Sequence, residues 1–176
     1  MTDAQALGFA LHQSPCSHTH FSHCKESLLK PSHSEAVCLL ETWRDLKRRG
    51  GMIVGKHFPT RRWSELLPHV ALLDRVRGKM DFRVRLAGFG LFCFYGYDLR
   101  GKRLSEIYGE GRFLSRYGEM DEVLATDQPL VSRVSVYDGD EPFLAREVLT
   151  LPVLANDTRT RLILSASFWT QRRWLN

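Results

Sequence analysis

DFRVRLAG, at residues 81–88, carries the clearest structural signal in the chain. Its apolar side chains alternate with Arg83 and Arg85, which is the period of a strand with one buried face. Residues 77–79 (RGK) are typical of a turn, and residues 69–74 (HVALLD) form a second apolar run. The sequence therefore predicts two antiparallel strands joined by a turn.

Three more strand-like runs close the chain, at residues 130–137, 143–153 and 161–169. The last run has apolar or small residues at both sets of alternating positions, as expected for a strand at the centre of a sheet. Residues 89–126 separate the two groups of strands and show the spacing of helices. This order predicts an α+β domain whose five-stranded antiparallel sheet is covered on one face by short helices.

An amphipathic helix is predicted over residues 35–49, because apolar residues recur at helical spacing and two glycines follow. Residues 1–34 show no sustained periodicity and hold five of the seven histidines. We therefore divide the chain into a His/Cys-rich tail, residues 1–34, and one domain, residues 35–176, which includes the helix. The apolar face of the helix consists of Ala36, Leu39, Leu40, Trp43 and Leu46.

The composition is typical of a water-soluble globular protein, with 43% hydrophobic and 26% charged residues. No apolar run approaches the roughly 20 residues of a membrane span, and the first residues lack the basic start of a secretory signal. We expect a cytoplasmic protein without membrane contact. Its four cysteines are expected to be free thiols, because disulfide frameworks belong to secreted domains.

Several short motifs resemble those of the single-domain PAS-type sensors of α-proteobacteria. In chain order they are LLPH at 66–69, LLD at 72–74, DFRVRLAG at 81–88, GYDLRGK at 96–102, DQP at 127–129 and LP at 151–152. The resemblance covers about residues 35–170 and implies a five-stranded antiparallel sheet packed on short helices, with a cavity between them. It implies a fold more firmly than a function, because one fold hosts many functions.

The chain departs from this family just after the second strand. Phe89 follows Gly88, where the family usually has a small polar residue, and more aromatic residues come next. The implied cavity is therefore either open to a ligand or filled by the protein's own rings. The residues that we predict to line it, or to form the core in its place, are Phe89, Phe92, Cys93, Tyr95, Phe113, Tyr117 and Met120, with Arg83 or Arg85 as anion partners.

The sequence indicates no particular cofactor. Flavin-binding relatives carry their cysteine in an Asn-Cys-Arg-Phe-Leu stretch that Cys93 lacks, and a buried, inert thiol is the interpretation we prefer there. Haem-binding relatives need an axial histidine on the long helix, and residues 112–126 contain none. The ligand, if the cavity holds one, stays open at this stage.

A compact group of metal-ligating residue types lies in the tail. Imidazole and thiolate groups bind zinc, nickel or copper, and four of them close a site. The spacing matches no known zinc-finger pattern, so we interpret the segment as a polar tail, with a metal site as the alternative. The residues concerned are Cys16, His18, His20, His23 and Cys24.

The motifs favour binding over catalysis, because neither His57 nor His69 lies in a nucleophile motif. We predict a signal-sensing or regulatory module that binds a small ligand or a signalling protein. A nucleic-acid-associated protein is the alternative, since the net charge is +5 and basic residues cluster at 47–49, 61–62 and 172–173. It is less favoured, because the cluster at 47–49 also suits the negative end of the helix dipole.

The sequence also predicts a homodimer. The helix at residues 35–49 offers an apolar face that either pairs with a second copy, through Leu39, Leu40, Trp43 and Leu46, or packs on its own sheet. Both arrangements bury the same side chains.

Overall fold

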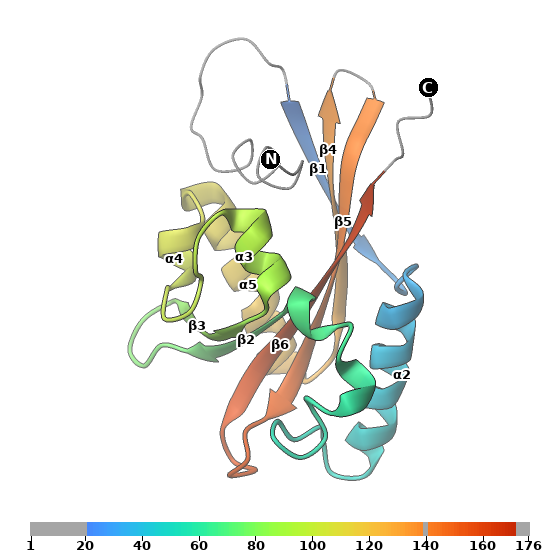
Figure 1. Cartoon of the computed structure of the whole chain (residues 1–176). Coiled ribbons are helices and arrows are strands. Elements are labelled where there is room, and N and C mark those ends of the chain that lie inside the picture. Colours follow the sequence, from blue (N-terminus) through green and yellow to red (C-terminus); the bar gives the residue numbers. More distant parts are fainter. Residues whose placement is uncertain (1–20, 139–140, 172–176) are drawn as a thin grey trace.

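The described residues form a six-stranded antiparallel sheet with helices on both faces (Figure 1). The structure is a computed structural model that describes residues 21–138 and 141–171. The spatial order of the strands is β1-β4-β5-β6-β2-β3. The strands are β1 (Phe21–Leu28), β2 (Val70–Arg75), β3 (Phe82–Ala87), β4 (Leu130–Asp138), β5 (Glu141–Leu154) and β6 (Arg161–Gln171).

The helices fall into two groups, one on each face of the sheet (Figure 1). This confirms the predicted α+β class and the antiparallel sheet, and it corrects two details. The sheet has six strands in place of five, and both faces are covered in place of one. One face carries α2 (Ser34–Arg48) and the 3₁₀ turn η1 (Arg61–Trp63). The other face carries α3 (Phe89–Tyr95), α4 (Leu104–Ile107) and α5 (Glu110–Thr126). A second 3₁₀ turn, η2 (Leu67–His69), leads into β2.

Strand β6 lies inside the sheet, between β5 and β2, as its sequence predicts. No residue from 162 to 168 is more than 6% exposed. Leu162 and Leu164 belong to the core under α2, whereas Ile163 belongs to the core under α3, α4 and α5. The apolar or small residues at both sets of positions thus serve two separate cores.

The predicted hairpin of β2 and β3 is present, with one irregularity. Val84 pairs with Leu73 and Leu86 pairs with Leu72, so β3 has one extra residue between these pairs. A bulge of this kind inverts the side-chain alternation beyond it. Phe82 and Val84 are therefore buried as predicted, whereas Leu86 is 56% exposed.

Helix α2 packs on its own sheet through the apolar face that the sequence predicts. Leu39, Leu40 and Trp43 are at most 3% exposed. The indole Nε1 of Trp43 donates a hydrogen bond of 2.7 Å to the backbone carbonyl of Pro152 in β5. Pro152 lies beyond the last residue of β5 that pairs with β4, so the absence of its N–H removes no hydrogen bond between β4 and β5.

This packing decides which alternative holds for the face of α2. Leu39, Leu40 and Trp43 are covered by their own chain, and Leu46 packs at the margin of the same core. The face is therefore not free to pair with a second copy. The homodimer itself stays a prediction and needs another surface.

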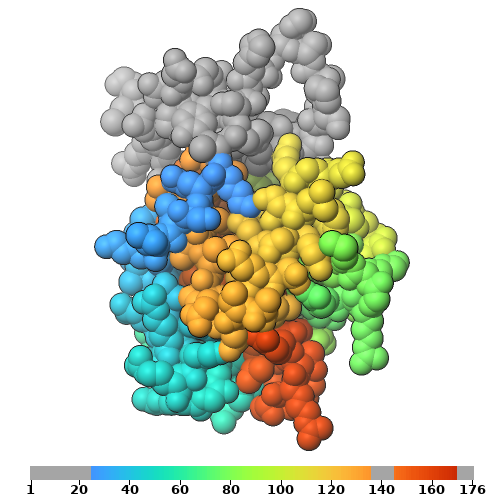
Figure 2. All heavy atoms as spheres, turned by 180° about the vertical axis from the view of Figure 1, so that it is seen from behind, coloured from blue at the N-terminus to red at the C-terminus, as the bar shows by residue number. Residues whose placement is uncertain are grey.

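Strand β1 corrects the division of the chain at residue 34. Phe21–Leu28 was expected to belong to an appended tail, and it instead pairs along β4, from Phe21 opposite Asp138 to Leu28 opposite Val131. In Figure 2 the blue residues that follow position 24 lie against the orange of β4 and the yellow of α5. Lys25 makes the contact to α5, because its Nζ lies 2.8 Å from Glu119 Oε1.

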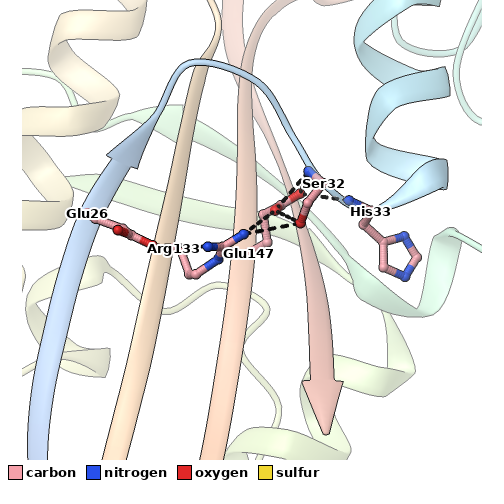
Figure 3. Close-up of polar contacts among 5 residues, drawn as sticks. All are labelled: Glu26, Ser32, His33, Arg133 and Glu147. Carbon is pink, nitrogen blue, oxygen red and sulfur yellow. Dashed lines mark hydrogen bonds and ion pairs between the residues drawn. The ribbon is translucent and has the colours of Figure 1, made fainter. Parts of the chain in front are cut away.

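A buried carboxylate fixes the turn between β1 and α2 (Figure 3). Glu147, in β5, is 3% exposed. It accepts hydrogen bonds from the Ser32 hydroxyl at 2.6 Å, from the Ser32 N–H at 3.0 Å and from the His33 N–H at 3.3 Å. Arg133 links this group to β1, since its guanidinium lies 3.6 Å from Glu147 and 3.1 Å from Glu26.

Gly88 marks a close approach of two backbones where β3 ends. Its N–H donates to the carbonyl of Val70 at 2.8 Å. A Cβ atom at this position would lie 2.0 Å from the carbonyl oxygen of Leu67 and 2.4 Å from that of Pro68. Only glycine fits, which gives a physical reason for the glycine that ends the DFRVRLAG motif.

Within residues 21–138 and 141–171, no helix has both the length and the apolar character that crossing a bilayer would require.

Candidate functional site

A small cavity lies between the central strands and the helices α3, α4 and α5. Its volume is about 40 Å³, which corresponds to room for roughly two or three water molecules. Most of its lining is apolar, but six polar side chains face it from four elements and the segment between α4 and α5. They are Tyr95 of α3, Tyr108, Arg116 of α5, Arg146 of β5, and Ser165 and Ser167 of β6.

Arg116 reaches the cavity from the buried face of α5 and is 8% exposed. Its Nη1 donates to Glu119 Oε2 at 2.6 Å, and its Nη2 lies 3.5 Å from Ser165 Oγ. The Nε of Arg116 has no hydrogen-bond partner among the described residues. Glu119 is shared, because it also pairs with Lys25 of β1.

Arg146 reaches the cavity from β5 and is held by aromatic groups. Its Nη1 donates to the hydroxyl of Tyr95 at 3.1 Å, and the guanidinium lies 5.6 Å from the centre of the Phe94 ring. Burial acts to lower the pKa of Arg146, but the phenol oxygens of Tyr95 and Tyr108 outweigh it and raise the pKa. The guanidinium is therefore charged at every physiological pH.

The hydroxyls of Tyr95 and Tyr108 are hydrogen-bonded to each other at 2.8 Å. Burial raises the pKa of Tyr108. Burial also acts to raise the pKa of Tyr95, but the charge of Arg146 and the hydrogen bonds from Tyr108 and Arg146 outweigh it, so that pKa is lowered. Either hydroxyl can donate this hydrogen bond, and in both cases one O–H of the pair is left for another acceptor.

Two of the predicted ligand-binding residues, Tyr95 and Met120, line the cavity. Phe89 is 72% exposed and Phe92 is 44% exposed, and their rings stack on each other at 5.6 Å. These two phenylalanines therefore do not fill the cavity. Cys93 is a partly buried free thiol and is not among the lining residues.

The other predicted residues lie elsewhere. The rings of Phe113 and Tyr117 contact each other at 6.2 Å, and Tyr117 packs on Phe82 at 5.6 Å, next to the cavity and not in its lining. Arg83 and Arg85 are exposed, and Arg83 lies 3.4 Å from Asp74. The structure brings neither of these arginines to the cavity.

Arg116 and Arg146 occupy the place expected for Arg83 or Arg85, and the sequence analysis missed both. Arg116 could have been found, because it lies at helical spacing from Phe113 and Met120 on the apolar face of α5. Arg146 shows no such signal. It joins the site because the sheet register places it opposite Trp169 of β6, on the face that α5 covers.

The metal site that was the alternative interpretation of the tail is not tested. Cys16, His18 and His20 lie outside the described residues, and His23 and Cys24 occupy consecutive positions of β1. Among the described residues no group of His, Cys, Asp and Glu could hold a metal ion. The polar tail stays the preferred interpretation, and the metal site stays its alternative.

The basic clusters are partly engaged within the fold. Lys47 forms an ion pair with Asp127, and Arg48 forms one with Asp45. Arg62 lies over the ring of Trp63 at 5.0 Å. Residues 172–173 lie outside the described part of the chain.

Comparison with solved structures gives a match of low identity. A solved structure described as an RNA-binding Light-Oxygen-Voltage receptor aligns over 87% of this chain with 12% identity and a TM-score of 0.44. The alignment covers 40% of that receptor, so this chain spans less than half of its length. No curated protein matches the sequence.

A protein-family model matches most of the chain. The PAS domain family matches residues 31–166, which begin just before α2 and include five of the six polar side chains of the cavity; Ser167 lies one residue beyond the match. Strand β1 precedes the match. Since the match extends over most of the sequence and agrees with the antiparallel sheet and its helices, the chain belongs to the PAS domain family.

Proposed function

We propose that this PAS domain is a non-catalytic signal-sensing module whose signal is a small ligand held between the sheet and α3, α4 and α5. PAS domains are in general sensory and signalling modules. The observation that carries the proposal is the presence of six polar side chains in the cavity lining, since a space that served packing alone would be lined by apolar side chains only. The narrower resemblance to single-domain sensors of α-proteobacteria is part of the same proposal.

The size of the cavity limits what it accepts as it stands. Drug-sized ligands occupy pockets of roughly 300–1,000 Å³, whereas this cavity measures about 40 Å³. A ligand of only a few heavy atoms fits directly. A larger one requires the helices around the cavity to move away from the sheet.

Native mass spectrometry combined with a thermal-shift screen tests the proposal. A ligand that raises the melting temperature of the wild-type protein should fail to do so in Ser167→Leu, because a leucine side chain fills the cavity at residue 167. Ser64→Leu is the matched control, since Ser64 is exposed on the other side of the sheet. Equal stabilisation of both variants would place the ligand elsewhere and contradict the proposal.

A protein partner is a second candidate, favoured by the exposed ring pair of Phe89 and Phe92. Exposed aromatic residues are typical of interaction surfaces. Replacing Phe89 by Ser should then weaken binding of the signalling partner, or self-association if the partner is a second copy. Sedimentation of the purified wild type and of Phe89→Ser separates these cases: self-association shows as a dimer only in the wild type.

A further inference from the structure

The polar side chains around the cavity offer more hydrogen-bond donors than acceptors. Two guanidinium groups face it, and a guanidinium has five N–H donors and no acceptor. The lining contains no aspartate or glutamate among the residues that the structure describes. Glu119 is the carboxylate that contacts Arg116, and it is shared with Lys25.

Arg116 supplies the first unsatisfied donor. Its side chain is nine-tenths buried, its Nε has no partner among residues 21–138 and 141–171, and its contact with Ser165 is at the limit of a hydrogen bond, at 3.5 Å. Buried donors in folded proteins are nearly always paired. An acceptor is therefore missing next to this guanidinium.

The hydroxyl pair of Tyr95 and Tyr108 supplies the second donor. The Tyr95 oxygen accepts a hydrogen bond from Arg146 at 3.1 Å, and the two hydroxyls share one hydrogen bond of 2.8 Å. Since two O–H groups make one hydrogen bond between them, one O–H of the pair is left to donate. Arg146 adds a charge that no carboxylate among the described residues neutralises within ion-pair distance.

We propose that the cavity binds a small planar oxyanion, of the chemical class of a short carboxylate, through Arg116, Arg146 and a hydroxyl of the Tyr95–Tyr108 pair. This inference rests on the proposed function and names the class of its ligand. Paired N–H donors of a guanidinium match the two oxygens of a carboxylate. A volume of about 40 Å³ admits an anion of three or four heavy atoms and excludes larger acids unless the helices move.

Titration of the purified full chain with sodium formate, acetate and nitrate tests the inference. Each titration is followed by calorimetry and by melting temperature, with sodium chloride at matched ionic strength as the reference, because screening alone changes stability. The wild type should show saturable stabilisation by the planar oxyanions beyond that by chloride. Arg146→Met should lose about tenfold or more of the affinity, since it removes a charge-assisted contact.

Two further variants keep the test decisive. Tyr95→Phe removes one hydroxyl and should weaken binding less than Arg146→Met does. Arg83→Met changes an exposed arginine outside the cavity and should bind as the wild type does. Oxyanion effects that match those of chloride, or that persist unchanged in Arg146→Met, would overturn the inference.

The failure of this inference is distinguishable from that of the proposed function. If a neutral compound stabilises the wild type but not Ser167→Leu, and no oxyanion does, the sensor proposal stands and the oxyanion class is wrong. If neither kind of compound depends on residue 167, both proposals fail.

Discussion

The carboxylate of Glu147 accepts a 2.6 Å hydrogen bond from the hydroxyl of Ser32, although the two residues are 115 positions apart in the sequence. The same carboxylate receives the backbone N–H groups of Ser32 and His33 (Figure 3). These contacts attach the segment between β1 and α2 to the middle of the sheet. Several donors converge on one buried charge, so its removal leaves them all without a partner.

Glu147→Gln should lower the free energy of unfolding by about 2 kcal/mol, because hydrogen bonds to a charged, buried group are lost or weakened. Urea unfolding measures this difference. Glu26→Gln is the control, since Glu26 contacts the same Arg133 but is exposed, and it should cost less than about 0.5 kcal/mol. Equal losses of unfolding free energy in the two variants would contradict a larger contribution of Glu147 to stability than of Glu26.

The stabilisation by Glu147 should depend on pH. Burial acts to raise the pKa of Glu147, but hydrogen bonds from Ser32 and His33 and the charge of Arg133 outweigh it, so the pKa lies below its ordinary value of 4.5. A lowered folded-state pKa means that the ionised group stabilises the fold above pH 4.5 and loses this effect as the pH falls through the folded-state pKa.

The difference in unfolding free energy between the wild type and Glu147→Gln should therefore be largest near neutral pH and shrink on acidification below 4.5. Urea titrations at a series of pH values measure it. A difference that grows toward acid pH would mean that Glu147 is protonated in the folded state.

Trp43→Phe should lower the free energy of unfolding by about 2 kcal/mol, because it removes the hydrogen bond to Pro152 and leaves a small void in the core under α2. Sedimentation should be the same for the variant as for the wild type, since Trp43 is covered by its own chain. A variant that keeps its stability but loses a dimer would restore this face of α2 as the dimer interface.

Two glycine substitutions should have opposite effects. Gly88→Ala should cost about 3 kcal/mol, because the new Cβ would lie 2.0 Å from the carbonyl oxygen of Leu67. Gly118→Ala should stabilise the protein by roughly 0.5–1 kcal/mol, since residue 118 lies in α5 with nothing within 4 Å of a Cβ. Thermal unfolding of both variants gives the comparison, and a tolerated Gly88→Ala would contradict the close approach at the end of β3.

Local patterns were enough to predict the strands that face a core on one or both sides. The alternation in β3 before its bulge and the apolar run of β6 report burial directly, so both strands were predicted in their observed places. Strand β1 was missed because its sequence, FSHCKESL, is mostly polar and has no alternation. It is a strand because the edge of β4 offers backbone hydrogen-bond partners along its whole length. The residues of β1 alone contain no information about such a partner elsewhere in the chain.

The site residues show the same difference between local and long-range signals. Tyr95 and Met120 were predicted from their place in an aromatic segment and on a helix face, and both line the cavity. Arg146 depends on the register between β5 and β6, which is a long-range property. Arg116 was visible in principle, as a charge on the apolar face of α5, but exposed Arg83 and Arg85 were given the anion role instead.

Strand β1 has a consequence for the solution behaviour of the protein. The PAS domain match begins at residue 31, so β1 lies ahead of it and shields the outer edge of β4. Unshielded strand edges recruit other chains and start aggregation. In the described sheet one outer strand carries Lys25 and Glu26, and the other, β3, carries Arg83 and Arg85. A shortened chain that begins at the family boundary would uncover β4, and it should be more prone to self-assemble than the chain that keeps its first strand.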